Sequence, residues 1–179
     1  MIVLPSRRFK APPIAQRNLD HRAKLWPDIS DADLWLRKQR DGYTTIPRNM
    51  TLFMAIMDQM SKGKPVSMTY LELWCRAFDE GFITLRPELA FYAGFTGQRA
   101  ERTWKERIRI LAALRFIDIK SGASGPESYA LIFNPYKVLE GHRANKTAGL
   151  TDGKYNAMLA RAAEIGAKDL DPQALADPV

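Results

Sequence analysis

One stretch of the chain, residues 97–114, constrains the fold more than any other, because its apolar residues recur at a helical spacing. These residues are Ala100, Trp104, Ile108 and Leu111. They lie three or four positions apart, so they share one face of an α-helix and are expected to point into a core. The other face of this helix is polar and mainly basic. It carries Gln98, Arg99, Arg102, Lys105, Glu106 and Arg109.

The segments around this helix predict a turn before it and a β-hairpin after it. A short apolar helix is expected at 87–93, and a tight glycine turn follows at 94–96. After the long helix, two β-prone runs at 116–120 and 129–133 flank a glycine-rich loop at 121–128. The order is therefore a short helix, a turn, a basic helix and a hairpin.

This order resembles the winged helix-turn-helix, a DNA-binding fold whose second helix enters the major groove. The family pattern of arginine, threonine and a hydrophobic residue early in that helix is matched by Arg102-Thr103-Trp104. Its leucine-rich run into the wing is matched by residues 111–117. Arg115 stands where the family usually has glycine, so the helix end lacks its preferred left-handed residue.

The resemblance also implies that the β-prone run 82–85 pairs with the hairpin to make a three-stranded sheet. From about residue 35 to the C-terminal tail, the chain is similar to uncharacterised winged-helix proteins of proteobacterial plasmids and mobile elements. This resemblance therefore implies no particular activity.

We therefore predict a mainly α fold of the α+β type, a winged helix-turn-helix with a small β-hairpin wing and helical extensions at both ends. The expected segments are a basic, proline-containing arm (1–29), a helical extension and connector (30–46), the winged-helix domain (47–140), and a linker, amphipathic C-terminal helix and acidic tail (141–179).

The N-terminal arm is strongly basic. Residues 1–27 contain six basic residues, among them Arg7 and Arg8, against a single acidic residue. Four prolines are expected to prevent long regular structure there. Such an arm either lies along phosphates or in a minor groove of DNA, or is a solvated tail or a strap packed on the domain. Ser30 is expected to cap a helix that ends at Gly42.

Two helices are expected to build the core before the basic helix. The first, 51–60, is rich in methionine, which favours a core helix over an adaptable partner surface. The second is predicted to begin at Thr69, with Glu72 completing a capping box. Its inward residues would be Leu71, Trp74, Cys75 and Phe78, so we expect the only cysteine to be a buried structural thiol.

The C-terminal region is expected to hold a polar linker, 141–150, and one further helix capped by Thr151. That helix carries an apolar stripe of Tyr155, Met158, Leu159, Ala162 and Ile165. Because so short a helix is marginal alone, the stripe must be buried. It either docks on its own domain or pairs with a second subunit.

Composition narrows the class of function. The 179 residues include 27 Lys and Arg against 20 Asp and Glu, a net charge of +7, which favours a polyanionic partner. No run is long and apolar enough for a membrane span, and no secretory signal is visible, so we expect a cytoplasmic protein. No spacing of Cys and His residues suggests a metal, and no phosphate-binding loop suggests a nucleotide. We expect neither a catalytic role nor a cofactor.

The basic helix and the hairpin supply the candidate DNA contacts. Gln98, Arg99 and Arg102 are expected to reach base edges, and Thr103 a phosphate. The other candidates are Lys105, Arg109, Lys120, Ser121 and Ser124. Although basic residues are common on any solvated helix, their position in the second helix of this order favours DNA binding.

We thus predict a sequence-specific double-stranded DNA-binding protein that is a homodimer and acts as a transcriptional or plasmid-maintenance regulator. No small-molecule ligand is evident from the sequence. Two alternatives stay open: a replication-initiator-type winged-helix module, and an adaptor that binds protein through the winged domain and the terminal helices.

Overall fold

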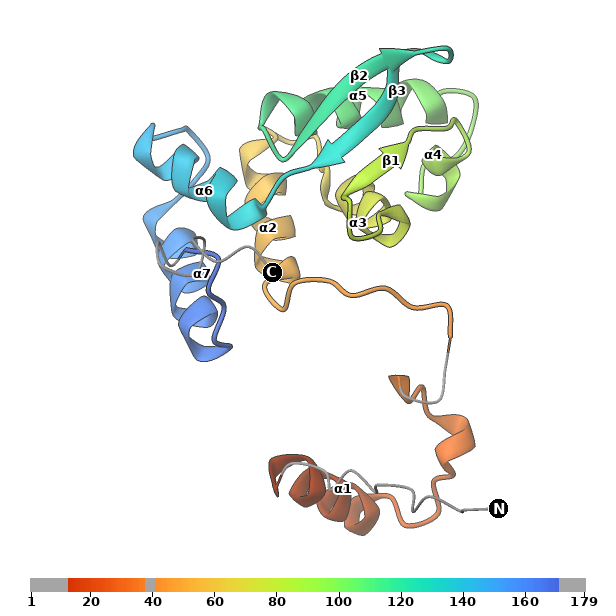
Figure 1. Ribbon diagram of the computed structural model, residues 1–179, viewed down its shortest axis with the longest axis vertical. Helices are drawn as coiled ribbons and strands as arrows, with labels where there is room; N and C mark the ends of the chain where they lie inside the picture. Colours follow the sequence, from red (N-terminus) through yellow and green to blue (C-terminus); the bar gives the residue numbers. More distant parts are fainter. Residues whose placement is uncertain (1–12, 38–40, 171–179) are drawn as a thin grey trace, which may run out of the picture. The chain divides into compact units, whose positions relative to one another are not determined.

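The computed structural model describes residues 13–37 and 41–170 (Figure 1). The chain divides into two compact units, Met1–Tyr43 and Thr44–Val179. The expected arm residues Arg7 and Arg8, and the end of the acidic tail, lie outside the described residues. None of the helices in the described ranges combines the length and apolar character that a membrane crossing requires.

The first unit contains a helix, α1 (Pro13–Leu25), where prolines were expected to prevent long regular structure. That expectation was wrong because Pro13 occupies the first helical position. The amide of this position has no intrahelical partner in any helix, and the fixed φ of proline suits a helix start.

The predicted helix from Ser30 to Gly42 is also corrected. The Ser30 hydroxyl accepts a hydrogen bond from the Ala32 amide at 3.2 Å, but the resulting element is a single 3-10 turn, η1 (Asp31–Asp33). Leu34 already has an extended backbone, with φ −104° and ψ 144°. Residues 38–40 lie outside the described residues.

The second unit is mixed α+β, with one small sheet and six of the seven described α-helices. Its elements are α2 (Met50–Met60), α3 (Ser67–Arg76), β1 (Phe82–Thr84), α4 (Leu89–Tyr92), α5 (Ala100–Ala113), β2 (Ile117–Gly122), β3 (Gly125–Ile132), α6 (Pro135–Ala144) and α7 (Asp152–Glu164). The strands pair antiparallel in the order β1–β3–β2. The prediction that the short strand before α4 joins the hairpin is confirmed.

The core of this unit lies between α2, α3, α5 and the inner face of the sheet, and α4, α6 and α7 add buried residues to it (Figure 1). The methionine-rich helix is a core helix, as expected, and its buried residues are Met50, Phe53, Ile56, Met57 and Met60. On the sheet, Ile83, Ala130 and Ile117 are buried, one from each strand. These residues alternate with outward-facing ones, as the two-residue repeat of a strand requires.

Helix α3 begins at Ser67, two residues before the predicted cap at Thr69. The cap comes instead from α2, because the Asp58 carboxylate accepts hydrogen bonds from the amides of Val66 (2.7 Å) and Ser67 (2.9 Å). Thr69 lies inside the helix and is only 1% exposed, so the expected capping box does not form.

The earlier start changes which side chains of α3 face the core. Tyr70 and Leu73 are fully buried, whereas Leu71 and Trp74 are only half-buried. Cys75 is exposed and Phe78 is 80% exposed, so the expected buried thiol and inward phenylalanine were both wrong. Phe78 lies beyond the last helical residue and no longer follows the helical repeat.

Helix α6 (Pro135–Ala144) was not predicted, and it extends over the first four residues of the expected polar linker, 141–144. The Asn134 side chain accepts a hydrogen bond from the Tyr136 amide at 3.0 Å, and Pro135 takes the first helical position. The asparagine–proline pair that ends β3 therefore also starts a helix, because both residues suit a helix N-terminus.

A buried asparagine ties α6 and α7 to the start of α2. Asn49 is fully buried, and its Nδ2 donates hydrogen bonds to the Tyr136 hydroxyl (3.0 Å) and the Met158 carbonyl (3.1 Å). Thr151 caps α7 as predicted, and Met158 and Ala162 are buried, with α7 packed on α2. Met158 and Ala162 of the predicted stripe thus dock on their own unit, with Tyr155 packed against the core, whereas Leu159 is exposed.

Helix α5 ends in a turn of the type that usually contains a glycine, although no glycine is present. The Phe116 amide donates to the Leu111 carbonyl and the Arg115 amide to the Ala112 carbonyl, both at 3.0 Å. This pair of bonds is the Schellman motif, which needs a left-handed residue. Arg115 itself takes that conformation, with φ +62°.

Replacing Arg115 with glycine is expected to stabilise the protein. Glycine has no Cβ to clash in the left-handed region, so Arg115→Gly should raise the free energy of unfolding by about 0.5–1 kcal/mol. This net value includes an opposing effect, because glycine gives the unfolded chain more conformational entropy. Urea denaturation measures this change. Arg115→Ala, which keeps the Cβ, is the control, and equal stability of the two variants would contradict the explanation.

Candidate nucleic-acid interface

A glycine turn positions the start of α5. At the end of α4, the Phe95 amide donates to the Ala90 carbonyl and the Gly94 amide to the Phe91 carbonyl, both at 2.9 Å. Gly94 has φ +86°, the left-handed conformation that this turn demands. The turn lets two helices meet at an angle within a few residues, as the sequence predicted.

Helix α5 begins at Ala100, three residues later than predicted. Gln98 and Arg99 therefore lie in the turn before the helix, and Arg99 is its N-cap residue. Both residues are exposed. They stand at the end of α5 where free amides and the helix dipole favour negative charge.

The buried face of α5 fixes its rotation and confirms the predicted inward residues. Trp104 is 1% exposed, and Ile108 and Leu111 are fully buried. Ala100 is half-buried at the first turn. Because these residues hold one face against the core, Arg102 and Arg109 necessarily face away from it, and both are exposed.

Several of the candidate contacts are already engaged in ion pairs. Lys105 pairs with Glu101 at 2.6 Å, Arg109 with Glu127 at 2.6 Å, and Lys120 with Asp118 at 3.0 Å. The bond from Lys120 holds the pKa of Asp118 below its usual range. By contrast, the side chains of Arg99 and Arg102 make no hydrogen bond or ion pair with any described residue.

The one acidic residue at the centre of the outward face is neutralised by its neighbours. Glu106 lies on the solvent side, as expected, with its side chain 42% exposed. Its carboxylate accepts hydrogen bonds from Lys64 and, at 3.1 Å, from Arg107. The bond from Lys64 is the main reason that its pKa lies below the usual value. Glu106 therefore subtracts little from the positive potential around Arg102.

The ion pair of Arg109 ties α5 to the hairpin. The Glu127 side chain on β3 is only 7% exposed, whereas Arg109 is 56% exposed. A carboxylate that is so buried needs a partner, because desolvation of an unpaired charge is unfavourable. Arg109 thus has a structural role that its exposed position in the sequence pattern did not indicate.

Removing Arg109 is expected to destabilise the unit by leaving Glu127 unpaired. Arg109→Ala should lower the free energy of unfolding by about 1–3 kcal/mol, the penalty for leaving a buried polar group without its partner. Glu127→Gln should suppress most of that loss when combined with Arg109→Ala. A double-mutant cycle in urea measures the coupling, and additive effects would contradict the pairing.

The hairpin is longer and tighter than predicted. Strand β2 runs through Ser121 to Gly122 and β3 begins at Gly125, so only two residues separate strands where eight were expected to form a loop. Ser124 is one of these two and is exposed, as are Lys120 and Ser121. The tip of the hairpin and the start of α5 lie at the same end of the unit, on the right in Figure 1.

Comparison with models of known protein families, with curated proteins and with solved structures gave no match. Within the described ranges, no group of three or more His, Cys, Asp or Glu side chains is placed to hold a metal ion. Thr103, the remaining candidate on α5, is half-buried.

A second surface was missed by the sequence reasoning. Phe91 and Tyr92 on α4 are 69% and 57% exposed, and their rings meet edge to face at 5.9 Å between centroids. The Arg76 guanidinium lies over the Tyr92 ring, 4.7 Å from its centroid. The apolar run 87–93 predicted a short helix, but nothing in its local pattern marks which of its aromatic residues stay exposed.

Proposed function

We propose that this protein binds double-stranded DNA in a sequence-specific manner, with α5 in the major groove and the β2–β3 hairpin as the wing of a winged helix-turn-helix. Arg99 and Arg102 would contact base edges, with Gln98 beside them. The contacts to the phosphate backbone would come from Lys120, Ser121 and Ser124 in the hairpin.

The observation that carries this proposal is the pair of unengaged arginines at the start of α5. Arg99 and Arg102 are exposed and have no partner among the described residues, although the other basic candidates on the same helix are paired. An arginine fork can bond two acceptors on guanine, which makes it the commonest specific contact in the major groove. The helix end that carries both arginines also favours phosphate.

The order and pairing of elements support the same proposal. Helix α3 is followed by β1, the α4–α5 pair and the β2–β3 hairpin, and β1 pairs with β3. In a winged helix-turn-helix, the second helix of the pair reads DNA. The anchoring of Trp104 and the Arg109–Glu127 pair would hold α5 and the hairpin in one arrangement.

We further propose that the protein is a homodimer that acts in the cytoplasm as a transcriptional or plasmid-maintenance regulator, working by occupying its site. A replication-initiator-type module is the other role that fits the same DNA surface. Half-sites related by two-fold symmetry would accompany a dimer. Light scattering of the full chain, free and bound to a selected site, tests this assembly.

Selection of DNA by the purified protein, followed by binding titrations at several salt concentrations, tests the DNA-binding proposal. A selected duplex should bind more tightly than a random one, and log Kd should rise steeply with log salt because counterions are released. Failure to enrich any sequence, together with binding that salt does not weaken, would overturn the proposal.

One observation favours a second candidate, an adaptor that binds protein. The exposed aromatic surface of Phe91 and Tyr92, with Arg76 beside it, has residue types that are enriched at protein interfaces. Phe91→Ala distinguishes the two roles. It should leave DNA affinity unchanged if α5 reads DNA, and should remove partner binding if the aromatic surface is the functional one.

A further inference from the structure

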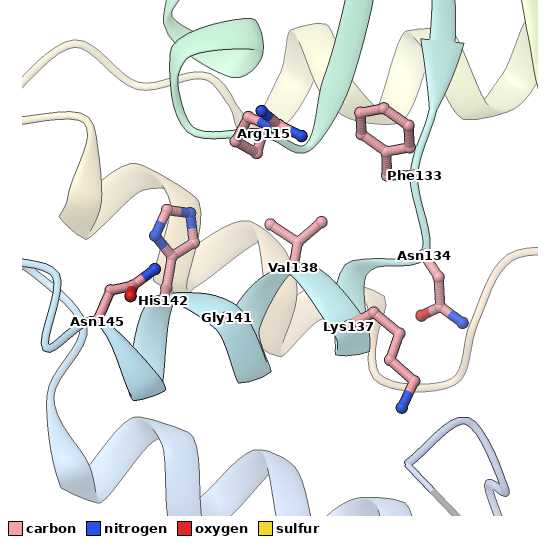
Figure 2. Close-up of a pocket in the computed structure, with 8 residues that line it drawn as sticks. All are labelled: Arg115, Phe133, Asn134, Lys137, Val138, Gly141, His142 and Asn145. Atoms are coloured by element: carbon pink, nitrogen blue, oxygen red, sulfur yellow. The ribbon is translucent and has the colours of Figure 1, made fainter. Parts of the chain in front are cut away.

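A cavity of about 500 Å³ lies between α6 and the segment that joins α5 to β2. Its lining comes from three parts of the chain: Arg115 after α5, Phe133 and Asn134 after β3, and one face of α6. The α6 residues are Lys137, Val138, Gly141, His142 and Asn145. Figure 2 shows Arg115 and Phe133 facing Val138 and His142 across the opening. Volumes of this size are typical of small-molecule sites.

The charged side chains that line the cavity are cationic, and the Asp169 carboxylate lies beside the lining, 2.8 Å from Asn134 Nδ2. Arg115 and Lys137 are cationic, and none of the described residues that line the cavity is acidic. Arg115 makes no side-chain hydrogen bond or ion pair with the described residues, and the nearby Asp118 is bonded to Lys120 instead. Lys137 pairs with Glu140 at 3.3 Å outside the lining. Arg115 is therefore the lining cation that has no hydrogen-bonded or ion-paired partner among the described residues, and its charge also acts on Asp118.

The floor of the cavity is apolar and held in place. Phe133 and Val138 provide carbon surface. The His142 Nε2 lies 2.7 Å from the Leu114 carbonyl, which can only accept, so this nitrogen donates and fixes the ring. The Thr147 hydroxyl lies 3.0 Å from Nδ1. Gly141 adds no side chain to the face of α6, and a Cβ built there would meet no atom within 4 Å.

We propose that this cavity binds a small organic anion with an apolar body, of the size of an aromatic carboxylate. The Arg115 guanidinium would bond the carboxylate, and the ring would lie against Phe133 and Val138 in the space that Gly141 leaves. The charge and volume of the cavity do not depend on whether the protein binds DNA, so the two proposals succeed or fail separately.

The probe for this site is 2-naphthoate, with 2-naphthamide as its neutral analogue, titrated against the full chain by calorimetry and by NMR of the Gly141 and His142 amides. A ligand of this size should bind with a Kd of about 1 mM or tighter. The amide should bind roughly tenfold more weakly, because it lacks the charge that Arg115 recognises. Equal binding of the two compounds would overturn the proposal.

Two variants that should still fold test separately how the charge and the volume of the cavity contribute to ligand binding. Arg115→Gly is expected to be at least as stable as the parent and should weaken 2-naphthoate binding roughly tenfold. Gly141→Leu, a helix-favouring change, should fill the cavity and abolish binding of both compounds.

Gly153→Leu on α7 is the matched control, since a Cβ there also meets nothing within 4 Å, and it should bind like the parent. Unchanged binding in Arg115→Gly and Gly141→Leu would overturn the proposal, and so would the absence of saturable binding at about 10 mM 2-naphthoate.

Discussion

Replacing Trp104 with alanine is expected to lower the free energy of unfolding by about 3–5 kcal/mol. The side chain is 1% exposed and is the largest of the fully buried residues in the core. Two contributions add up to this loss. The variant no longer gains the free energy of burying the indole ring, and a cavity remains between α5 and the rest of the core. This loss is a large fraction of the stability of a small domain, so the variant should melt far below the parent in thermal circular dichroism.

The matched control is Phe91→Ala, which truncates an aromatic residue of the same unit that is 69% exposed. Because its ring is in solvent, the stability should change by less than about 0.5 kcal/mol. A Trp104→Ala variant as stable as the Phe91→Ala variant would mean that α5 is rotated, with its tryptophan outward. The assignment of the DNA-facing residues would then be wrong as well.

The second large effect is expected on DNA affinity. Arg99→Ala or Arg102→Ala should each weaken binding to the selected duplex by about 1–3 kcal/mol if the arginine bonds guanine. Binding to random DNA should weaken much less, so the sequence preference at that position should relax. Fluorescence anisotropy with both duplexes measures the two affinities for each variant.

Two controls make this result specific. Arg161→Ala on α7 makes the same change in net charge away from α5, and it should weaken binding only slightly. Arg109→Ala should affect selected and random DNA alike, because Arg109 is bound to Glu127 and lies further along the helix. Equal losses on both duplexes for Arg99 and Arg102 would indicate non-specific binding, and no loss would favour the adaptor role.

Local patterns were sufficient where an element is held by its own periodic residues. The buried face of α5, the core helix α2 and the Thr151 cap of α7 follow from spacing and capping preferences alone. The pairing of β1 with the hairpin came from the family resemblance, because strand partners are far apart in sequence.

Long-range contacts explain most of what the sequence did not reveal. The cap of α3 is Asp58, a residue of another helix, and a local capping box at Thr69 was the only signal visible in the sequence. The residue type alone does not distinguish the basic residues of the candidate interface, which are Arg99, Arg102, Lys105 and Arg109. The Glu101–Lys105 pair has helical i,i+4 spacing and is visible in the sequence, whereas the pairing of Arg109 with Glu127 joins α5 to β3 and is not.

Two prolines that were expected to interrupt regular structure instead begin helices. Both α1 and α6 start with a proline at their first position, where it is favourable. The cavity beside α6 was likewise beyond reach, because it depends on Arg115, Phe133 and α6 meeting in space.

The pairing of β1 with β3 affects which parts of the second unit unfold together. Helices α4 and α5 lie in the chain between these two strands, so the strands close a loop that contains the proposed reading helix. Such a closure forms late in folding, since distant residues must first meet. Because α5 also packs against β2, which lies beside β3 in the sheet, we expect the release of α5 from the core to weaken the sheet as well. Hydrogen exchange should therefore show the amides of β1, α5 and β3 opening together, as one cooperative unit.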